Sequence, residues 1–162
     1  MRTARWIGSV ASLLAVVAVL AVLGLHQGVA APPGYTPQTR NFTVTTVPLA
    51  VHEMQASMPF LKKAFAAGGV LGPKKEVYGF YPSTLVVYQG DTVNLTIVNP
   101  QDDDHTFTIH DLKVDVEVKG LSTARTSFVA KKVGVFTFMC DIEEHMPYMW
   151  GQLVVLPDSA AR

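Results

Sequence analysis

One cysteine, two histidines and a methionine stand at spacings that suit a metal site. Cys140, His145 and Met149 lie within a run of ten residues, and His105 lies upstream of them. A thiolate combined with two imidazoles and a weak thioether suits copper better than it suits cations that prefer oxygen ligands. The sequence therefore predicts a copper site with two histidines, one cysteine and a distant methionine.

The alternation of side chains along a strand selects the upstream histidine. His105 alternates with Phe107 and Ile109, whereas His110 falls in the other register with two threonines. Successive side chains of a strand point to opposite faces, so His105 is expected to face inward with the apolar residues. We interpret His110 as a surface imidazole and predict His105 as the ligand.

Each candidate ligand also has an ordinary structural interpretation. The lone Cys140 could be a buried thiol or could pair with another chain in a disulfide. Met146 competes with Met149 for the distant position, because methionine often fills gaps in a core. The position of Met149 two residues before Gly151 favours Met149. The placement of the whole set in one short loop favours ligands over structural residues.

The run from Cys140 to Gly151 resembles the ligand loop of the cupredoxins. Its C-x4-H-x3-M-x-G spacing is similar to that of the azurin subgroup. The resemblance extends upstream to residues 104–109, which look like the strand of the first histidine, and to residues 83–93, which look like the opening hairpin. It covers residues 78–156, about half of the chain.

The resemblance implies a mononuclear type 1 copper site. In it His105, Cys140 and His145 would be the strong ligands and Met149 a weak axial ligand. The backbone carbonyl of Asp104 would lie near the opposite axial position. Such a protein carries one electron between extracytoplasmic redox partners while its single copper ion cycles between Cu(II) and Cu(I), and it catalyses no net reaction by itself.

The resemblance further implies a buried His105 and a His145 whose edge is exposed to a docked partner. Apolar residues would surround that edge, and patches of this kind often mark transient interfaces. Ordinary packing around the metal is the alternative interpretation of these side chains. They are Met146, Pro147, Tyr148 and Trp150.

Two other functions stay open at this point. Glu143 and Glu144 stand where azurin-like loops commonly have Pro-Gly, and a carboxylate ligand would produce a red, catalytic site like that of nitrosocyanin. That branch has a carboxylate where His105 stands and a second histidine in the loop, which this chain lacks. The domain could also deliver copper or act as a subunit beside a membrane oxidase or reductase. A dinuclear centre is excluded, because bridging needs two cysteines.

The two loop carboxylates are also expected to tune the copper. Negative charge beside His145 favours the more positive, oxidised state of the site and lowers its reduction potential. We expect neutralisation of Glu143 and Glu144 to raise that potential.

The segments that must position these residues read mostly as strands. Alternating residues and turns rich in Gly, Asn and Asp predict an all-β antiparallel sandwich. The cupredoxin resemblance selects a Greek-key topology for it. The strands are expected at Asn41–Val47, Ser83–Tyr88, Thr92–Asn99, His105–Ile109, Val114–Val118, Thr123–Phe128, Val135–Cys140 and Gln152–Leu156.

A short helical insertion interrupts this pattern. Met54, Met58, Leu61 and Phe65 recur at helical spacing, which predicts an amphipathic helix over residues 54–67 that glycines and a proline then stop. His52 with Met54 and Met58 could form a second copper site. Methionines at helical spacing more often belong to a core, which is the interpretation that we prefer.

The N-terminal segment indicates export. Two arginines precede an apolar run over residues 7–25, which reads as a secretory signal within residues 1–30 or as an uncleaved membrane anchor. A linker over residues 31–40 then leads to one copper-binding domain over residues 41–162. Thirteen basic and thirteen acidic residues balance, so nothing indicates a nucleic acid partner. We expect a periplasmic or extracellular location, with membrane-associated protein partners.

Overall fold

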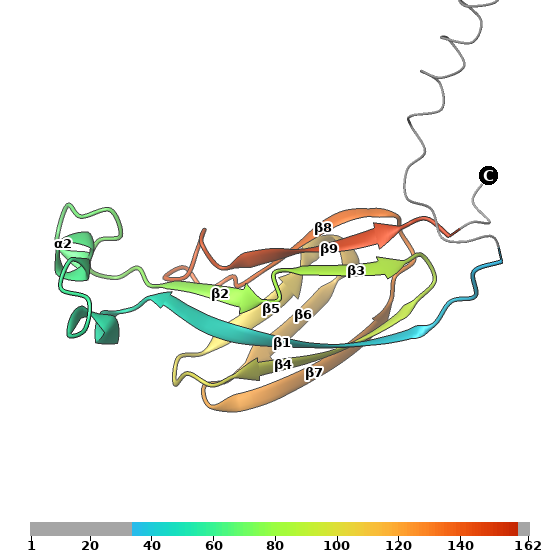
Figure 1. Cartoon of the computed structure of the whole chain (residues 1–162), viewed down its shortest axis with the longest axis horizontal. Coiled ribbons are helices and arrows are strands. Elements are labelled where there is room, and N and C mark those ends of the chain that lie inside the picture. The colour runs from blue at the N-terminus through green and yellow to red at the C-terminus, as the bar shows by residue number, and fades with distance from the viewer. Residues whose placement is uncertain (1–33, 159–162) are drawn as a thin grey trace, which may run out of the picture. The chain divides into compact units, whose positions relative to one another are not determined.

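The computed structural model describes residues 34–158, within which nine strands form two sheets that pack on one another (Figure 1). The predicted signal or anchor over residues 7–25 lies outside the described residues. Among those that are described, no helix is long and apolar enough to cross a membrane. The strands are β1 (Thr39–Ala50), β2 (Val77–Tyr81), β3 (Thr84–Tyr88), β4 (Thr92–Asn99), β5 (His105–Ile109), β6 (Val114–Val118), β7 (Ser122–Val129), β8 (Gly134–Met139) and β9 (Trp150–Leu156).

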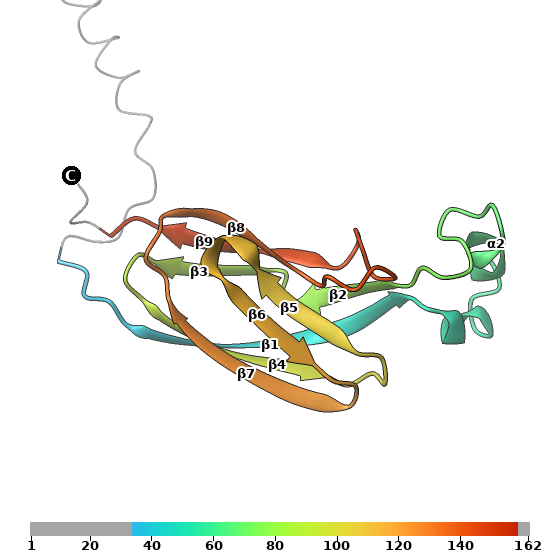
Figure 2. The same ribbon diagram turned by 180° about the vertical axis from the view of Figure 1, so that it is seen from behind.

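The order of strands in the two sheets brings distant segments together. One sheet has the order β2-β1-β4-β7 and the other the order β3-β9-β8-β5-β6 (Figure 2). The pairs β1 with β4 and β3 with β9 are parallel, so the expectation of an antiparallel sandwich is wrong for these two pairs. The remaining pairs are antiparallel. As a result β5 and β8, which lie far apart in the sequence, become neighbours in the second sheet.

The core lies between the sheets and follows the predicted alternation. In β4 every second residue is buried, and the same holds for β9 from Gly151 onward. Three phenylalanines from both sheets meet in the core: the ring of Phe107 lies 4.9 Å from that of Phe138, and Phe80 contacts both edge-on. The predicted all-β sandwich with a short helical insertion is confirmed, and this core supports the end of β5 that carries His105.

The strand boundaries agree with the sequence to within a few residues. β1 is longer than expected, because it begins at Thr39, within the segment 31–40 predicted as linker, and continues to Ala50. β2 was not foreseen as a separate strand. It pairs with β1 alone and is an edge strand, so its packing on β1 defines it more than its own alternation does.

The expectation of one helix over residues 54–67 is wrong. The structure has a 3-10 turn, η2 (His52–Gln55), then turns, and then the short helix α2 (Leu61–Phe65). Pro59 explains the interruption, because proline lacks an amide hydrogen and disfavours a helical conformation at the preceding residue, Met58. The segment from η2 to residue 76 forms a lobe beyond the ends of β1 and β2 (Figure 1).

Candidate metal centre

Three of the predicted ligands meet at one end of the sandwich. The Nδ1 atoms of His105 and His145 lie 3.2 Å apart, and the sulfur of Cys140 lies 3.5 Å from Nδ1 of His145. One potential ligand atom from each of the three side chains lies within 4.8 Å of the others, and all three side chains are buried. A soft sulfur and two ring nitrogens that converge among buried residues form a donor set that suits copper. These residues could therefore hold a metal ion.

The pairing of β5 with β8 positions the cysteine beside the first histidine. Thr108 of β5 pairs with Met139 of β8, so the chain beyond Met139 runs along Thr106. The amide of Thr106 donates a hydrogen bond to the sulfur of Cys140 at 3.4 Å, and the amide of Asp141 donates to Oγ1 of Thr106 at 2.8 Å. Thr106 therefore joins the strand of one candidate ligand to the loop that holds the others.

Backbone hydrogen bonds hold the loop between β8 and β9 in successive turns. The amides of His145 and Met146 both donate to the carbonyl of Ile142, and the amide of Met149 donates to the carbonyl of His145. The loop closes where the amide of Cys140 donates to the carbonyl of Met149 at 3.0 Å. These bonds restrict the loop on both sides of Glu143 and Glu144.

The end of the loop explains the glycine of the predicted pattern. A β-carbon on Gly151 would lie 2.3 Å from the ring of Phe138 and 2.6 Å from the carbonyl oxygen of Ser83, so no larger residue fits. Of the two competing methionines, Met149 is buried and Met146 is only partly buried. The axial role of Met149 stays a prediction.

Tyr78 lies against both histidines, and the sequence did not reveal this. Its ring centre is 4.7 Å from that of His105 and 4.8 Å from that of His145, with steep angles between the ring planes. Its hydroxyl lies 3.0 Å from a carboxylate oxygen of Glu76 and 2.5 Å from one of Asp103, and it can donate its single hydrogen to either. A buried phenol thus fixes the two imidazoles from the side of β2.

Burial keeps the histidines uncharged. Desolvation, followed by the charge of His145, lowers the pKa of His105 to about 4. Desolvation also lowers the pKa of His145. Neutral imidazole is the form that binds a metal ion. Burial and the hydrogen bond to Asp103 raise the pKa of Tyr78, so this phenol stays protonated.

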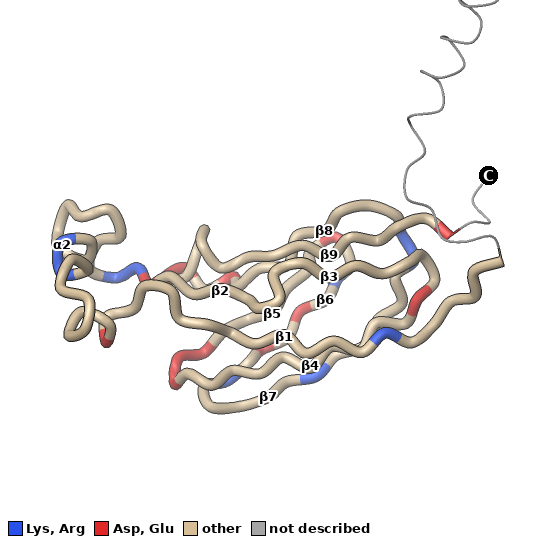
Figure 3. The backbone as a smooth tube through the Cα atoms, in the orientation of Figure 1, with Lys and Arg blue, Asp and Glu red and all other residues tan. Residues whose placement is uncertain are grey.

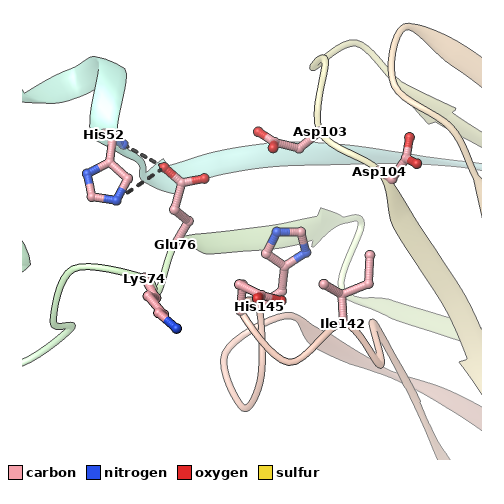
Figure 4. A pocket seen from close by; sticks show the side chains of 8 residues that line it. His52, Lys74, Glu76, Asp103, Asp104, Ile142 and His145 are labelled. Carbon is pink, nitrogen blue, oxygen red and sulfur yellow. Dashed lines mark hydrogen bonds and ion pairs between the residues drawn. The ribbon is translucent and has the colours of Figure 1, made fainter.

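A cavity of about 380 Å3 lies over His145 (Figure 4). The expected apolar surround is not found here. The segment that follows the helical lobe lies along the ligand loop, where Lys75 donates to the carbonyls of Glu143 and Met146 and the amide of Glu76 donates to the carbonyl of Glu144. This contact brings charged side chains over His145. The cavity is lined by His52, Lys74, Glu76, Asp103, Asp104, Ile142, Glu144 and His145.

The apolar residues of the ligand loop border a different hollow. Tyr148 and Trp150 line a groove of about 550 Å3 together with Leu49 and Tyr81, which come from β1 and β2. All four side chains are exposed. The groove lies between the open edge of β2 and the start of β9, and His145 does not line it.

The other candidate residues lie apart from the three ligands. His110 is exposed, and its Nε2 lies 3.4 Å from a carboxylate oxygen of Asp141. His52 packs its ring 4.2 Å from Phe65 and contacts Gln55, while Met54 packs against the core and Met58 is exposed. Residues 34–158 contain one group of three histidine, cysteine or carboxylate side chains that could hold a metal ion, namely His105, Cys140 and His145.

Sequence reasoning missed the residues that surround the ligands. Asp103 stood in a run of three aspartates that reads as a solvated turn, and Glu76 and Lys75 stood in a charged segment after the glycines. Tyr78 is the first residue of the region that resembles the cupredoxins, and this was the one indication of its importance in the sequence. Nothing in the sequence indicated that it contacts the histidines.

Comparisons with known proteins agree with this geometry. A family model of the cupredoxin-like domain matches residues 74–155. The copper nitrite reductase from Nitrosomonas europaea superposes with a TM-score of 0.53 at 22% identity, covering 76% of this chain and 43% of that one. The multicopper oxidase mgLAC superposes with a TM-score of 0.51 at 20% identity, covering 74% of this chain and 39% of that one. The chain thus spans less than half the length of either enzyme, and no curated protein matches it.

Proposed function

Because the chain belongs to the family of cupredoxin-like domains, we propose that it is a mononuclear type 1 copper protein that carries single electrons between extracytoplasmic redox partners. His105, Cys140 and His145 would be the strong ligands and Met149 the weak axial ligand. Copper bound there would supply a one-electron couple between Cu(II) and Cu(I). The observation that carries the proposal is the burial of two imidazoles and the only cysteine with their ligand atoms turned toward one another.

The protein's own residues favour fast electron exchange in this proposal. The loop from Cys140 to Met149 is tied by backbone hydrogen bonds, and Tyr78 packs on both imidazoles. A preformed site changes little between oxidation states, so little energy is needed to rearrange it. The amide of Thr106, which donates to the sulfur, partly offsets the charge of the thiolate.

A catalytic red-copper site is the alternative. It would need a carboxylate among the metal ligands. Glu144 lines the cavity over His145, yet within residues 34–158 no carboxylate joins the group formed by His105, Cys140 and His145. A carboxylate ligand would require the loop to rearrange. This favours a closed site over one with a position open to substrate. Two further roles differ from both of these. Copper delivery would require ready release of the copper ion, and a subunit role would require a fixed partner, a membrane oxidase or reductase.

The optical and EPR spectra of the isolated chain loaded with Cu(II) test the proposal. An intense blue thiolate band with narrow copper hyperfine splitting is expected. Cys140→Ser should abolish the band and leave a folded sandwich, because serine is smaller than cysteine and fits the same space. A red protein with wide splitting would favour the catalytic alternative. Colour retained in Cys140→Ser would reject the ligand assignment.

A voltammogram of the same sample distinguishes a carrier from a delivery protein. A carrier keeps its copper through repeated oxidation and reduction, whereas a delivery protein loses it to a chelator of Cu(I). Export and membrane attachment form the remaining part of the proposal, and fractionation of cells that produce the full chain tests them.

A further inference from the structure

The helical lobe exposes large apolar side chains on both sides of α2. Phe60 directly precedes this helix and is 70% exposed, Val70 follows it and is 85% exposed, and Met58 is 42% exposed. The helix has five residues and is about 8 Å long, so the two apolar segments stay close together. We call residues 56–70 the tip of the lobe, which projects beyond the ends of β1 and β2 (Figure 1). Exposed apolar groups gathered in one place mark contact with a protein, a ligand or a membrane.

The tip is folded, and its own packing does not use these exposed residues. Leu61 and Phe65 of α2 are buried and form the inner side of the helix. A β-carbon on Gly69 would lie 2.3 Å from the carbonyl oxygen of Ala64, so the loop that carries Val70 packs directly on the end of α2. The apolar side chains in solvent are therefore held in place by a small core to which they do not belong.

The lobe is also strongly basic. Residues 54–75 contain four lysines and no carboxylate, although the whole chain has a formal charge of zero. Lys62 and Lys63 stand in α2 between the two apolar segments and are exposed, and within residues 34–158 neither forms an ion pair. Figure 3 shows this positive charge at α2. A surface that combines unpaired positive charge with apolar groups is complementary to an anionic surface with an apolar layer below it.

The composition of the tip favours a lipid surface over a protein. Residues 54–75 contain no tryptophan, tyrosine or arginine, which supply most of the binding energy at protein interfaces. Lysine is depleted from such interfaces. At a membrane, by contrast, lysine buries its apolar stem and keeps its ammonium among the headgroups. The groove beside Tyr148 and Trp150 has the composition of a protein interface, and the tip does not.

We propose that the tip of the helical lobe docks on the surface of a membrane that contains anionic lipid. Phe60 and Val70 would enter the layer between headgroups and acyl chains, and Lys62 and Lys63 would bind lipid phosphates. The same lobe supplies His52, Lys74 and Glu76 to the cavity over His145, so docking would hold the metal centre beside the membrane. The inference does not depend on copper. If the tip docks but no blue copper forms, the proposed function fails and this inference stands.

Docking is tested on the metal-free full chain in lipid nanodiscs that carry a nitroxide on the lipid headgroup. The methyl NMR signals of Met58 and Val70 should broaden in discs of phosphatidylglycerol and phosphatidylcholine, and much less in discs of phosphatidylcholine alone. Both kinds of disc are needed, because the apolar run over residues 7–25 could tether the chain to either. Val133, exposed between β7 and β8, should show no difference between them. Equal broadening of Met58 and Val70 in the two discs, or none in either, would overturn the proposal.

Charge substitutions identify the lysines that dock. Lys62→Gln combined with Lys63→Gln should lower the ratio of docked to undocked chain about twentyfold, because each lysine near an anionic surface contributes a factor of about five. The matched control is Lys131→Gln combined with Lys132→Gln, which removes an exposed pair between β7 and β8 and should leave the ratio unchanged. An equal loss from the two pairs would show a general effect of charge and would contradict docking by the tip.

An apolar substitution tests the insertion step. Phe60→Ser should lower the same ratio about tenfold, because the ring would no longer leave water. Leu121→Ser, which changes a residue that is 75% exposed outside the lobe, should have no effect. If Phe60→Ser docks as well as the unchanged chain, the tip does not insert and the proposal fails.

Soluble polyglutamate tests the other class of partner, an acidic protein. At a salt concentration at which the anionic discs broaden the signals of Met58 and Val70, polyglutamate should leave both unchanged. A saturable response to polyglutamate without lipid would assign the tip to an acidic protein and would overturn the membrane proposal.

Discussion

Two buried polar clusters lie at opposite ends of β4, and they differ in how well their atoms are partnered. Asp91, just before β4, accepts hydrogen bonds from the amides of Gln38 and Tyr88 and from the side chains of Tyr35 and Arg40. Asn99, the last residue of β4, binds the loop that leads to the metal centre.

The metal centre shows the reverse. His105 is fully buried, yet its Nε2 has no partner within residues 34–158, and the one partner of its Nδ1 is Nδ1 of His145, with the donor set by the tautomers. A buried polar group without a partner costs free energy, so its persistence needs an explanation. The comparison teaches that the Asp91 cluster is complete and stabilises the fold, whereas the histidine cluster keeps a buried ring nitrogen without a partner.

The largest expected difference between the clusters is their response to copper. At a free copper concentration a thousandfold above the dissociation constant, binding should raise the free energy of unfolding by about 4 kcal/mol. Urea unfolding with and without the metal measures this. Cys140→Ser should lose most of the gain, while Asp91→Asn should keep it. An equal gain in Cys140→Ser would mean that copper stabilises the chain at another place.

Removal of the Asp91 charge should lower the free energy of unfolding by nearly as much as copper binding raises it. Asp91→Asn leaves two amides, a phenol and the guanidinium of Arg40 without their carboxylate, so we expect the free energy of unfolding to fall by about 3 kcal/mol. The blue band of the copper form should stay unchanged, because no ligand contacts this cluster. Urea unfolding and the optical spectrum check both parts. A shifted band would show that the two ends are coupled.

The clusters should also respond to acid in different ranges of pH. The pKa of His105 is about 4 in the folded chain and 6.5 ordinarily, so the unfolded chain takes up the proton first. The metal-free protein should therefore lose stability as the pH falls from 6.5 to 4, by at most about 3 kcal/mol.

Asp91 should act at lower pH. Burial alone raises the pKa of Asp91, but hydrogen bonds from Gln38, Tyr35, Tyr88 and Arg40 outweigh this and lower it. Its contribution is present above the ordinary pKa of 3.8 and is lost as the pH falls below that value. Unfolding curves measured from pH 7 to pH 3 should thus separate the two effects. The loss between pH 6.5 and 4 should persist in Asp91→Asn, and a flat profile there would argue against neutral buried histidines.

The smallest effect compares one phenol at each end. Tyr78→Phe and Tyr35→Phe each remove a hydroxyl that binds carboxylate or guanidinium, and each should cost about 1 to 2 kcal/mol in the free energy of unfolding. Only Tyr78→Phe should shift the EPR spectrum and reduction potential of the copper form, because its ring lies against His105 and His145. If the copper forms of the two variants gave equal EPR spectra, Tyr78 would have a structural role alone.

Most of the fold could be predicted because its causes are local. Side chains alternate along the strands, turn residues separate them, and the bounds of β4, β5 and β6 match the expected ones. The prediction of one helix over residues 54–67 was wrong for an equally local reason. The apolar residues have helical spacing, but Pro59 interrupts the helix. β2 was missed because an edge strand is defined by its neighbour.

Three of the four candidate ligands could be grouped from spacing alone, because Cys140, His145 and Met149 share one loop. The placement of His105 required the inward register of β5, which its burial agrees with. The cavity over His145 could not be predicted from the sequence. Its walls come from the helical lobe, the loop before β5 and the ligand loop, and the sequence does not indicate that these segments meet.

The sequence by itself determined the chemistry of the candidate centre, because ligand softness and spacing are properties of residue types along the chain. It also determined the sandwich, because alternation and turns act over a few residues. Only the tertiary structure decided what surrounds His145. Hydrogen bonds from Lys75 and Glu76 to the ligand loop bring carboxylates over His145, where an apolar face was expected. These bonds join segments some seventy residues apart, so they depend on the folded chain as a whole.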